Sequence, residues 1–258
     1  MRFGLSKLKS WMFQKLGVRQ TMPNNQSELI ERLSHELRTS LTGIVGYSEF
    51  VESSSTEPMV NFTAKIIRES SQSLSRASNS FFDLHRLELG ELKVNCTTFP
   101  ISALVRDVVR EHQRQALEQD VKLLFTCSAE TFLFDMYADS FRVRQLIDAL
   151  VFGGIQSAGK GKSIQVDISL DGDQSHLRFM VISLDSVFNA PQIELAKEFW
   201  CNDHYKFRLQ EGPGVELALA KSLIYFLQGA VEYRAALDEL PRLILTLPMR
   251  YRETKVCG

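Results

Sequence analysis

The amino-acid sequence predicts an α+β protein: a two-helix hairpin that pairs with a second copy into a four-helix bundle, followed by an α/β sandwich. Two stretches, residues 26–53 and 59–89, each carry a single apolar stripe with the period of an α-helix. From Val94 onward helical and strand-like patterns alternate, which favours helices packed on one face of a sheet. The expected parts are a basic tail, the hairpin, the sandwich and a second tail, at residues 1–25, 26–93, 94–250 and 251–258.

The first predicted helix has one apolar face and one polar face. Its apolar positions, spaced by three and four residues, are Ile30, Leu33, Leu37, Leu41, Ile44, Ser48 and Val51. At about 100° per residue they fall within about 40° of Leu37, whereas His35 lies about 160° from it. Thr39 follows His35 by one turn and shares its exposed face, with Glu36 on the flank. An imidazole held outward in this setting can act as a nucleophile toward a docked partner, although an ordinary solvated histidine fits the same phase.

A turn at residues 53–58 leads into the second predicted helix, and Gly90 is the expected C-cap at its end. The apolar face of this helix consists of Ile66, Ile67, Leu74, Ala77, Phe81, Leu84 and Leu87. A lone hairpin cannot bury two complete stripes, whereas two hairpins can do so in a four-helix bundle. We therefore expect a homodimer.

The second part of the chain is predicted to be mixed. Its expected helices are at residues 101–118, 139–150 and 214–228. Its expected strands are at residues 121–127, 163–170, 176–183, 230–235 and 242–247. A turn at Asp171-Gly172-Asp173 joins two of these strands into a hairpin.

Composition narrows the class of protein. The 258 residues are 44% apolar with a formal charge of −1, so the overall charge does not suggest nucleic-acid binding. The cysteines contain no CxxC pair, which argues against a zinc site and a disulfide framework and fits a reducing cytoplasm. No apolar run approaches the ~20 residues of a membrane span, so a membrane-spanning sensor is not expected in this chain.

Residues 1–25 are basic, with no acidic residue before Glu28. Leu5, Leu8, Trp11, Met12 and Leu16 fall near one face of a possible helix. Two interpretations stay open. Residues 1–20 can bind the inner membrane surface or a partner, or they can be a solvated tail.

The segment Ser34-His35-Glu36-Leu37-Arg38-Thr39-Ser40-Leu41 resembles the phosphoacceptor box of sensor histidine kinases. The resemblance implies that His35 accepts a phosphoryl group and that Glu36 orients the imidazole or takes its proton. It also implies that Thr39, four residues after the histidine, aligns water for dephosphorylation of a receiver. The family usually has a helix-kinking proline where this chain has Ser40, so a straighter helix is expected.

Residues 94–250 resemble the ATP-binding domain of the same family in the order and spacing of their elements. In active kinases of this family, a helix carries asparagines whose side chains bind magnesium and phosphate. When Arg144-Gln145 is used to align this chain with that helix, Ala149 and Gly153 stand at the asparagine positions. The adenine-binding aspartate and the two glycines after it are replaced by Ser183, Asp185 and Val187. A register slip could offer Asp185 as the adenine acceptor, but the glycines would still be absent. Phe199-Trp200 resembles the aromatic box beside the nucleotide lid, although such a pair is also typical of core packing.

The last glycine-rich turn is kept only in part. Gly212 and Gly214 remain, and Glu216 stands where the third glycine would be. A carboxylate there would face the triphosphate instead of letting backbone amides approach it. Three altered boxes predict a pseudokinase with no cofactor and no metal.

Three functions follow from these residues. The first is a dimeric phosphotransfer protein that exchanges a phosphoryl group between His35 and a receiver aspartate in trans, and dephosphorylates the receiver. The second is an active autokinase that uses ATP and magnesium in an atypical site. The third is a catalytically silent dimer that binds receivers or other kinases.

Overall fold

The computed structural model describes residues 24–184, 196, 198–200, 215–236 and 239–250. The chain forms two compact units, a helical hairpin and a larger α/β unit. No helix within the described ranges combines the length and apolarity needed to cross a membrane. The predicted tails, at 1–25 and 251–258, lie almost wholly outside the described residues.

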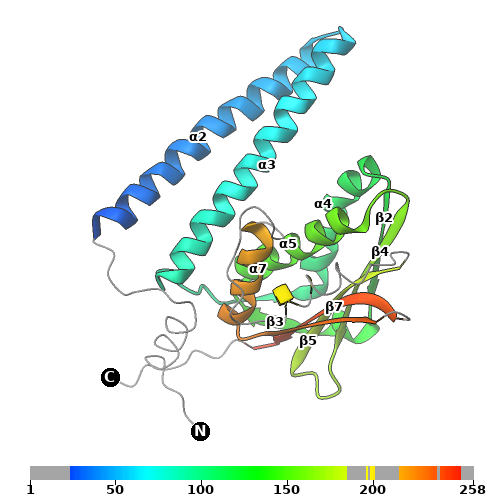
Figure 1. The fold of residues 1–258 in the computed structure, drawn as a ribbon. Helices are drawn as coiled ribbons and strands as arrows, with labels where there is room; N and C mark the ends of the chain where they lie inside the picture. The colour runs from blue at the N-terminus through cyan, green and yellow to red at the C-terminus, as the bar shows by residue number, and fades with distance from the viewer. Residues whose placement is uncertain (1–23, 185–195, 197, 201–214, 237–238, 251–258) are drawn as a thin grey trace. The chain divides into compact units, whose positions relative to one another are not determined.

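The hairpin consists of α2 (Asn24–Ser54) and α3 (Pro58–Glu88), which run antiparallel side by side (Figure 1). Both predicted helices are confirmed. Pro58 begins α3, at a position where its missing N–H costs no hydrogen bond. At the other end Gly90 has a φ of 70°, in the left-handed region that favours glycine.

The apolar stripe of α2 divides into two faces. Buried positions recur every seven residues, at Ser34, Leu41 and Ser48 on α2 and at Ala64 and Ser71 on α3. This spacing marks the contact between the two helices, which we call the hairpin seam. Serine and alanine predominate among these positions.

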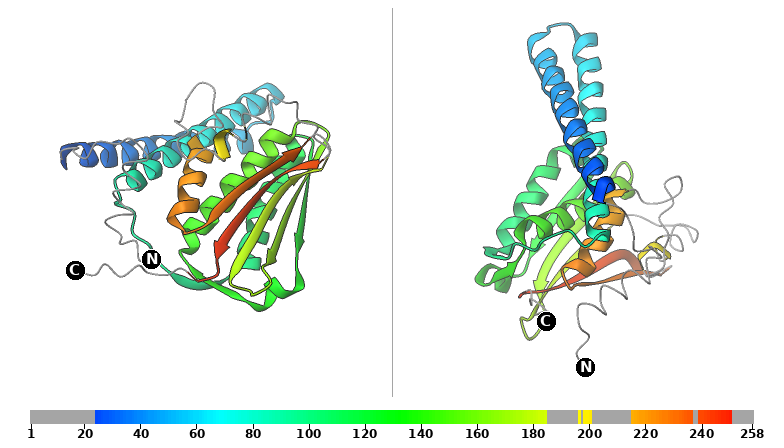
Figure 2. Two further views of the ribbon diagram at one scale, coloured as in Figure 1. Left: turned by 60° about the horizontal axis from the view of Figure 1, so that its bottom comes forward. Right: turned by 90° about the vertical axis from the view of Figure 1, so that its left-hand side faces the viewer.

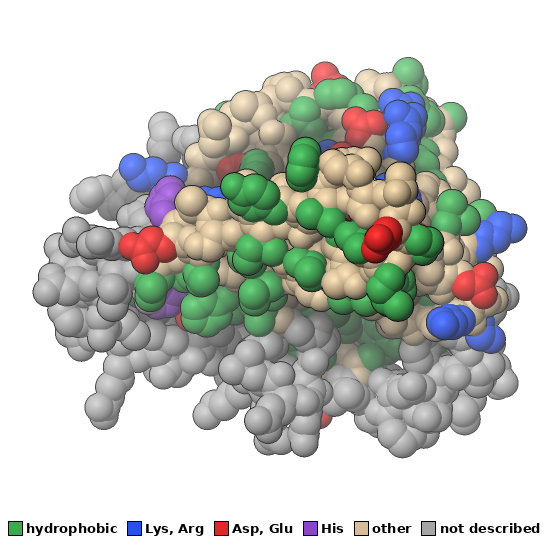
Figure 3. Space-filling view, turned by 90° about the horizontal axis from the view of Figure 1, so that it is seen from above, with side chains coloured by type: hydrophobic (Ala, Val, Ile, Leu, Met, Phe, Trp, Pro, Cys, Tyr) green, Lys and Arg blue, Asp and Glu red, His purple; other side chains and the backbone are tan. Residues whose placement is uncertain are grey.

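Most of the other large apolar side chains of the hairpin are exposed to solvent, although Phe82 and Leu87 of α3 are buried. On α2, Leu33, Leu37, Ile44 and Val51 are 38–44% exposed. The exposed large residues of α3 are Met59, Phe62, Ile66, Ile67, Leu74 and Phe81. Figure 3 shows hydrophobic side chains spread along the surface seen from above. This exposure agrees with the expectation that a lone hairpin cannot bury both stripes, because a single neighbouring helix covers only part of a stripe this wide.

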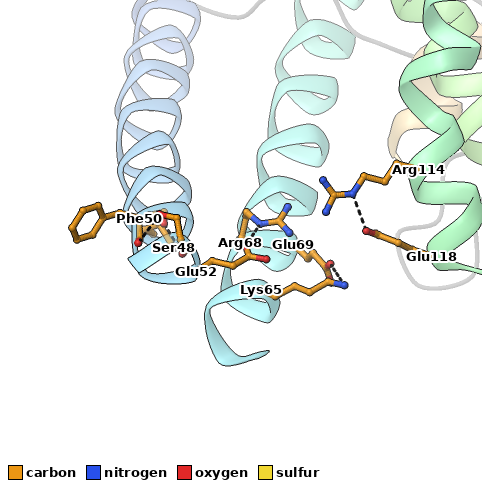
Figure 4. Close-up of polar contacts among 10 residues, drawn as sticks. Ser48, Phe50, Glu52, Lys65, Arg68, Glu69, Arg114 and Glu118 are labelled. Atoms are coloured by element: carbon orange, nitrogen blue, oxygen red, sulfur yellow. Dashed lines mark hydrogen bonds and ion pairs between the residues drawn. The ribbon is translucent and has the colours of Figure 1, made fainter. Parts of the chain in front are cut away.

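An apolar groove of about 500 Å³ opens on this exposed surface near the turn end of the hairpin. Its walls come from both helices: Ile44, Tyr47, Ser48, Val51, Met59, Val60, Thr63, Ala64 and Ile67. The hairpin is held in register beside it by Arg68 of α3, which bonds Glu52 of α2 (Figure 4).

The α/β unit begins with β1 (Thr97–Pro100), α4 (Ile101–Glu118), β2 (Val121–Cys127), η1 (Ala129–Leu133), β3 (Asp135–Ala138) and α5 (Ser140–Ala158). It continues with β4 (Lys162–Leu170), β5 (His176–Ser183), α7 (Val215–Phe226), of which only residues 220–226 group with this unit, β6 (Ala230–Ala236) and β7 (Glu239–Pro248). The five-stranded sheet has the order β2-β4-β5-β7-β6, with only β2 and β4 parallel. β1 and β3 form a separate antiparallel pair.

The core of this unit lies between one face of the sheet and the helices α4, α5 and the second half of α7 (Figure 2). The helices contribute fully buried Val105 and Ile147, and the strands contribute Val166, Ile168 and Phe179. Alternate residues of β4 are buried, at Ile164, Val166 and Ile168, which is the pattern of a strand with one covered face. The predicted α+β class is confirmed.

Candidate active site

His35 lies on the outer face of α2. Its side chain is exposed, as are those of Glu36 and Thr39, as the helical phase predicted. At about 100° per residue, His35 is about 180° from Ile44 and roughly 120° from the centre of the hairpin seam. The imidazole is therefore accessible from a direction that neither apolar face of the helix obstructs.

A row of hydroxyl groups follows His35 along the helix. Thr39 Oγ1 donates to the His35 carbonyl over 2.9 Å, and Ser40 Oγ donates to the Glu36 carbonyl over 2.9 Å. Thr42 Oγ1 donates in the same way to the Arg38 carbonyl over 2.8 Å. Because Ser40 replaces a proline, α2 continues through this turn to Ser54 without a break. The hydrogen of the Thr39 hydroxyl is donated to the backbone, and the lone pairs of its oxygen can still accept hydrogen bonds.

Arg38 connects the face that carries His35 to α3. Its Nε and Nη2 donate to Oδ1 of Asn79 over 3.3 and 2.9 Å. The sequence places Arg38 on the flank of the helix but gives no signal for Asn79, whose involvement depends on how α2 and α3 align.

Three of the positions that the resemblance assigns to nucleotide binding lie on α5 and β5. Ala149 is buried on α5, and Ser183 is the last residue of β5. The Ser183 hydroxyl is buried and makes no hydrogen bond to any described residue. Gly154 lies so close to the sheet that an added Cβ would fall 2.9 Å from Val181 Cγ1. Neither Ala149 nor Gly153 offers a side-chain ligand for magnesium.

The other positions assigned by the resemblance are not placed with these. Asp185, Val187, Gly212 and Gly214 lie outside the described residues, and Glu216 lies in the first turn of α7.

The Phe199–Trp200 pair lies in the core. The two rings are buried and meet edge to face at 4.7 Å between centroids. Lys221 of α7 is also buried, donates to the Phe199 carbonyl and places its ammonium 5.3 Å from the Phe199 ring centre. These contacts fit the core-packing interpretation of the pair.

One cluster of candidate metal ligands lies at the exposed β4–β5 turn. Ligand atoms of Asp171, Asp173 and His176 lie within 4.8 Å of one another. Hydrogen bonds from Ser175 lower the pKa of the Asp173 carboxyl. His176 N donates to Asp171 Oδ1 over 2.9 Å, and Ser175 N donates to Asp173 Oδ1 over 3.0 Å. These bonds stabilise the predicted turn and account for the cluster without an ion.

Comparison with protein families assigns the hairpin. The His Kinase A (phospho-acceptor) domain matches residues 25–90, which includes the whole segment from His35 through Asn79. Among curated proteins, the chain is 26% identical over 238 residues to the non-motile and phage-resistance protein of Caulobacter vibrioides. It is 24% identical over 227 residues to an uncharacterized sensor-like histidine kinase of Rhizobium meliloti. The alignments cover 90% and 86% of this chain but only 28% and 43% of those proteins.

Solved structures share the fold of both units. Full-length ShkA, determined in complex with AMPPNP, superposes with a TM-score of 0.64 at 23% identity, covering 86% of this chain and 45% of ShkA. The histidine kinase ThkA, determined in complex with the response regulator TrrA, gives 0.52 at 18% identity, covering 86% of this chain and 61% of that one. The hairpin is therefore a His Kinase A phosphoacceptor domain, and over most of its length the chain is similar to sensor histidine kinases.

Proposed function

We propose that the chain is a phosphotransfer protein in which His35 exchanges a phosphoryl group with an aspartate of a receiver domain. The observation that carries the proposal is the exposed His35 on the face of α2 opposite the exposed apolar stripe, with Thr39 one turn later on that face and Glu36 exposed on its flank. In the forward step, the phosphorus–oxygen bond of the receiver's aspartyl phosphate breaks as a bond to His35 Nε2 forms. Glu36 takes the imidazole proton or orients the ring. The ThkA structure contains a response regulator, which makes a receiver the natural partner class.

The working unit in this proposal is a homodimer. The buried positions of α2 and its exposed apolar positions are centred roughly 65° apart around the helix axis; the buried ones are Ser34, Leu41 and Ser48, and the exposed ones are Leu33, Leu37, Ile44 and Val51. Each helix of a four-helix bundle has two neighbours in about this relation. The first face meets α3, and the second face is therefore assigned to a second copy of the hairpin.

The nucleotide-binding residues do not fit ATP and magnesium. Replacing the adenine acceptor by the orphaned Ser183 hydroxyl removes a charge-assisted hydrogen bond, about 1.5–3 kcal/mol. A Glu216 carboxylate ~5 Å from a phosphate charge would cost on the order of 3 kcal/mol at an effective dielectric of about 20, and its ion pair with Arg76 would offset part of that cost. With the magnesium ligands also absent at Ala149 and Gly153, the total is on the order of 5 kcal/mol, a loss of roughly a thousandfold or more in affinity. No step of the proposed reaction passes through ATP.

Thr39 has the geometry for a second role. Its hydroxyl hydrogen is engaged by the His35 carbonyl, so the oxygen can accept a hydrogen bond from water. Water held there can attack the phosphorus of a docked aspartyl phosphate in line with the leaving oxygen. The products are inorganic phosphate and the free receiver aspartate.

The experiment incubates the purified chain with a panel of phosphorylated receivers and follows label on His35. Acid-labile label that appears on the wild type and not on His35→Gln supports phosphotransfer. Label from ATP and magnesium alone would replace this proposal with the autokinase. Binding of receivers that is unchanged in His35→Gln, with no label from any receiver, would replace it with the silent interaction dimer.

A further inference from the structure

The Arg38–Asn79 contact lies at the edge of the face that carries His35. Arg38 follows His35 by three residues, so the Cβ atoms of the two residues are about 5–6 Å apart on one side of α2. Around the helix axis, Arg38 lies about 60° from His35 on the side toward the hairpin seam. Its side chain is exposed and reaches α3, where Asn79 Oδ1 accepts from both Nε and Nη2.

The chemical nature of the acceptor distinguishes this contact from a salt bridge. Asn79 is an amide, so it fixes the guanidinium without cancelling its charge. An aspartate at the same position would hold the side chain more tightly and neutralise it. A guanidinium has five N–H donors, and two of Arg38's bond Asn79, which leaves three for another acceptor.

We propose that Asn79 is a positioning residue, which holds the Arg38 guanidinium with its charge intact for the phosphoryl group accepted by His35. This inference rests on the proposed phosphotransfer function. The phosphoryl group carries close to two negative charges and has three acceptor oxygens. A guanidinium that is already held in place is well suited to bind such a group. Because the site is exposed, the charge contributes modestly, about three- to tenfold in rate.

Phosphoramidate tests the inference without a receiver. This small anion transfers its phosphoryl group to imidazole: its phosphorus–nitrogen bond breaks, a bond to His35 Nε2 forms, and ammonia leaves with the imidazole proton. The full-length chain is incubated with phosphoramidate, and phosphorylated His35 is quantified by intact-protein mass spectrometry. The variants are Asn79→Asp, Asn79→Ala and Arg38→Gln, each measured at low and high ionic strength.

The matched control is Gln72→Asp. Gln72 lies one heptad before Asn79 on the same phase of α3, so the variant adds the same charge about 10 Å farther along the helix.

We expect phosphoramidate to phosphorylate His35 about three- to tenfold more slowly in Asn79→Asp and in Arg38→Gln than in the wild type. The rate in these two variants should also depend much less on ionic strength than the wild-type rate does. Asn79→Asp should have an unchanged or raised melting temperature, because it adds an ion pair, so slower loading cannot come from a weakened hairpin. Gln72→Asp should keep the wild-type rate.

Wild-type loading in Asn79→Asp would overturn the inference, and so would a wild type that phosphoramidate does not label at all. An equal loss in Gln72→Asp would also overturn it, since any added charge would then suffice. These results are independent of receivers, so a failure of receiver-dependent labelling counts against the proposed function alone.

Discussion

Arg68 of α3 donates its Nε hydrogen to Oε2 of Glu52 on α2 over 2.9 Å, and the two side chains are only 15% and 33% exposed (Figure 4). A partly buried pair between helices should stabilise the hairpin by about 1 kcal/mol. A double-mutant cycle with Arg68→Ala and Glu52→Ala, measured by urea unfolding, gives this coupling energy. The control is Lys65–Glu69, an exposed pair within α3 at 3.7 Å, which should couple by about 0.3–0.5 kcal/mol. Equal values for the two pairs would contradict the prediction.

The dimer prediction separates the two faces of α2. Leu37→Asp places a charge on the exposed apolar face, so it should disperse the dimer and leave the hairpin folded. Leu41→Asp buries a charge in the hairpin seam and should unfold the helices themselves. Phe50→Asp is the control, since Phe50 is 67% exposed and lies about 120° from Ile44 around the helix. Light scattering and circular dichroism measure the two effects, and a dimeric Leu37→Asp would place the interface elsewhere.

The wild-type chain should bind ATP weakly, and substitutions that reinstate the missing ligand residues should strengthen the binding in part. We expect calorimetry to give a dissociation constant for ATP with magnesium no tighter than millimolar, because the ligands are missing at Ala149, Gly153 and Ser183. Reinstating all three, as Ala149→Asn, Gly153→Asn and Ser183→Asp, should tighten binding by at least tenfold provided that the unfolding transition is kept. A micromolar dissociation constant for ATP with magnesium in the wild type would contradict the prediction and favour the autokinase interpretation.

Thr39→Ala should separate transfer from dephosphorylation. The substitution removes an acceptor for water but leaves His35 and the backbone in place. Transfer from a phosphorylated receiver to His35 should be retained, while net dephosphorylation of the receiver slows by something like 10² if positioning is the main role of the hydroxyl. Thr39→Ser, which keeps the hydroxyl, serves as the matched control. A phosphatase rate in Thr39→Ala equal to that of wild type removes the hydrolytic role.

Glu88 should make stability depend on pH. Burial raises the pKa of its carboxyl, and the nearby His85 opposes that shift only in part. The ionised carboxylate therefore destabilises the folded chain above its folded-state pKa. This penalty is relieved as the pH falls through that value, and it is gone below the unfolded pKa of about 4.3. Glu88→Gln should raise the midpoint of urea unfolding at pH 7.5 and make little difference at pH 4. A difference that is constant across this range would contradict the prediction.

The longer elements of the fold could be predicted because each has a strong local pattern. The helix at 101–118 and the strand at 121–127 match the observed bounds. The helix expected at 139–150 was too short, because α5 continues through Gly153 and Gly154 to Ala158. Close packing of Gly154 against Val181 explains glycine there, and no local pattern reveals it. The four-residue strands β1 and β3 were missed because they are defined only by pairing with each other, about 40 residues apart.

The candidate site also contains residues that the local sequence pattern predicts and residues that it does not. His35, Glu36 and Thr39 share one short helical segment, so the period of the helix was enough to place them on the exposed side. Asn79 could not be found, because its contact with Arg38 requires the alignment of two helices across 41 residues of sequence. The division of the apolar stripe at Leu41 likewise depends on which side α3 covers.

The angle between the two faces of α2 also determines how an assembly of hairpins ends. If the covered and exposed stripes of α2 were on opposite sides of the helix, each added hairpin would leave another apolar face exposed. The hairpins would then associate into an open layer of unlimited extent. Because the two stripes of α2 are adjacent rather than opposite, the proposed second copy would lie around a corner from α3, as in a four-helix bundle. In the proposed homodimer a two-fold axis would then close the assembly at two copies, because the same face of each hairpin would be used up in one contact.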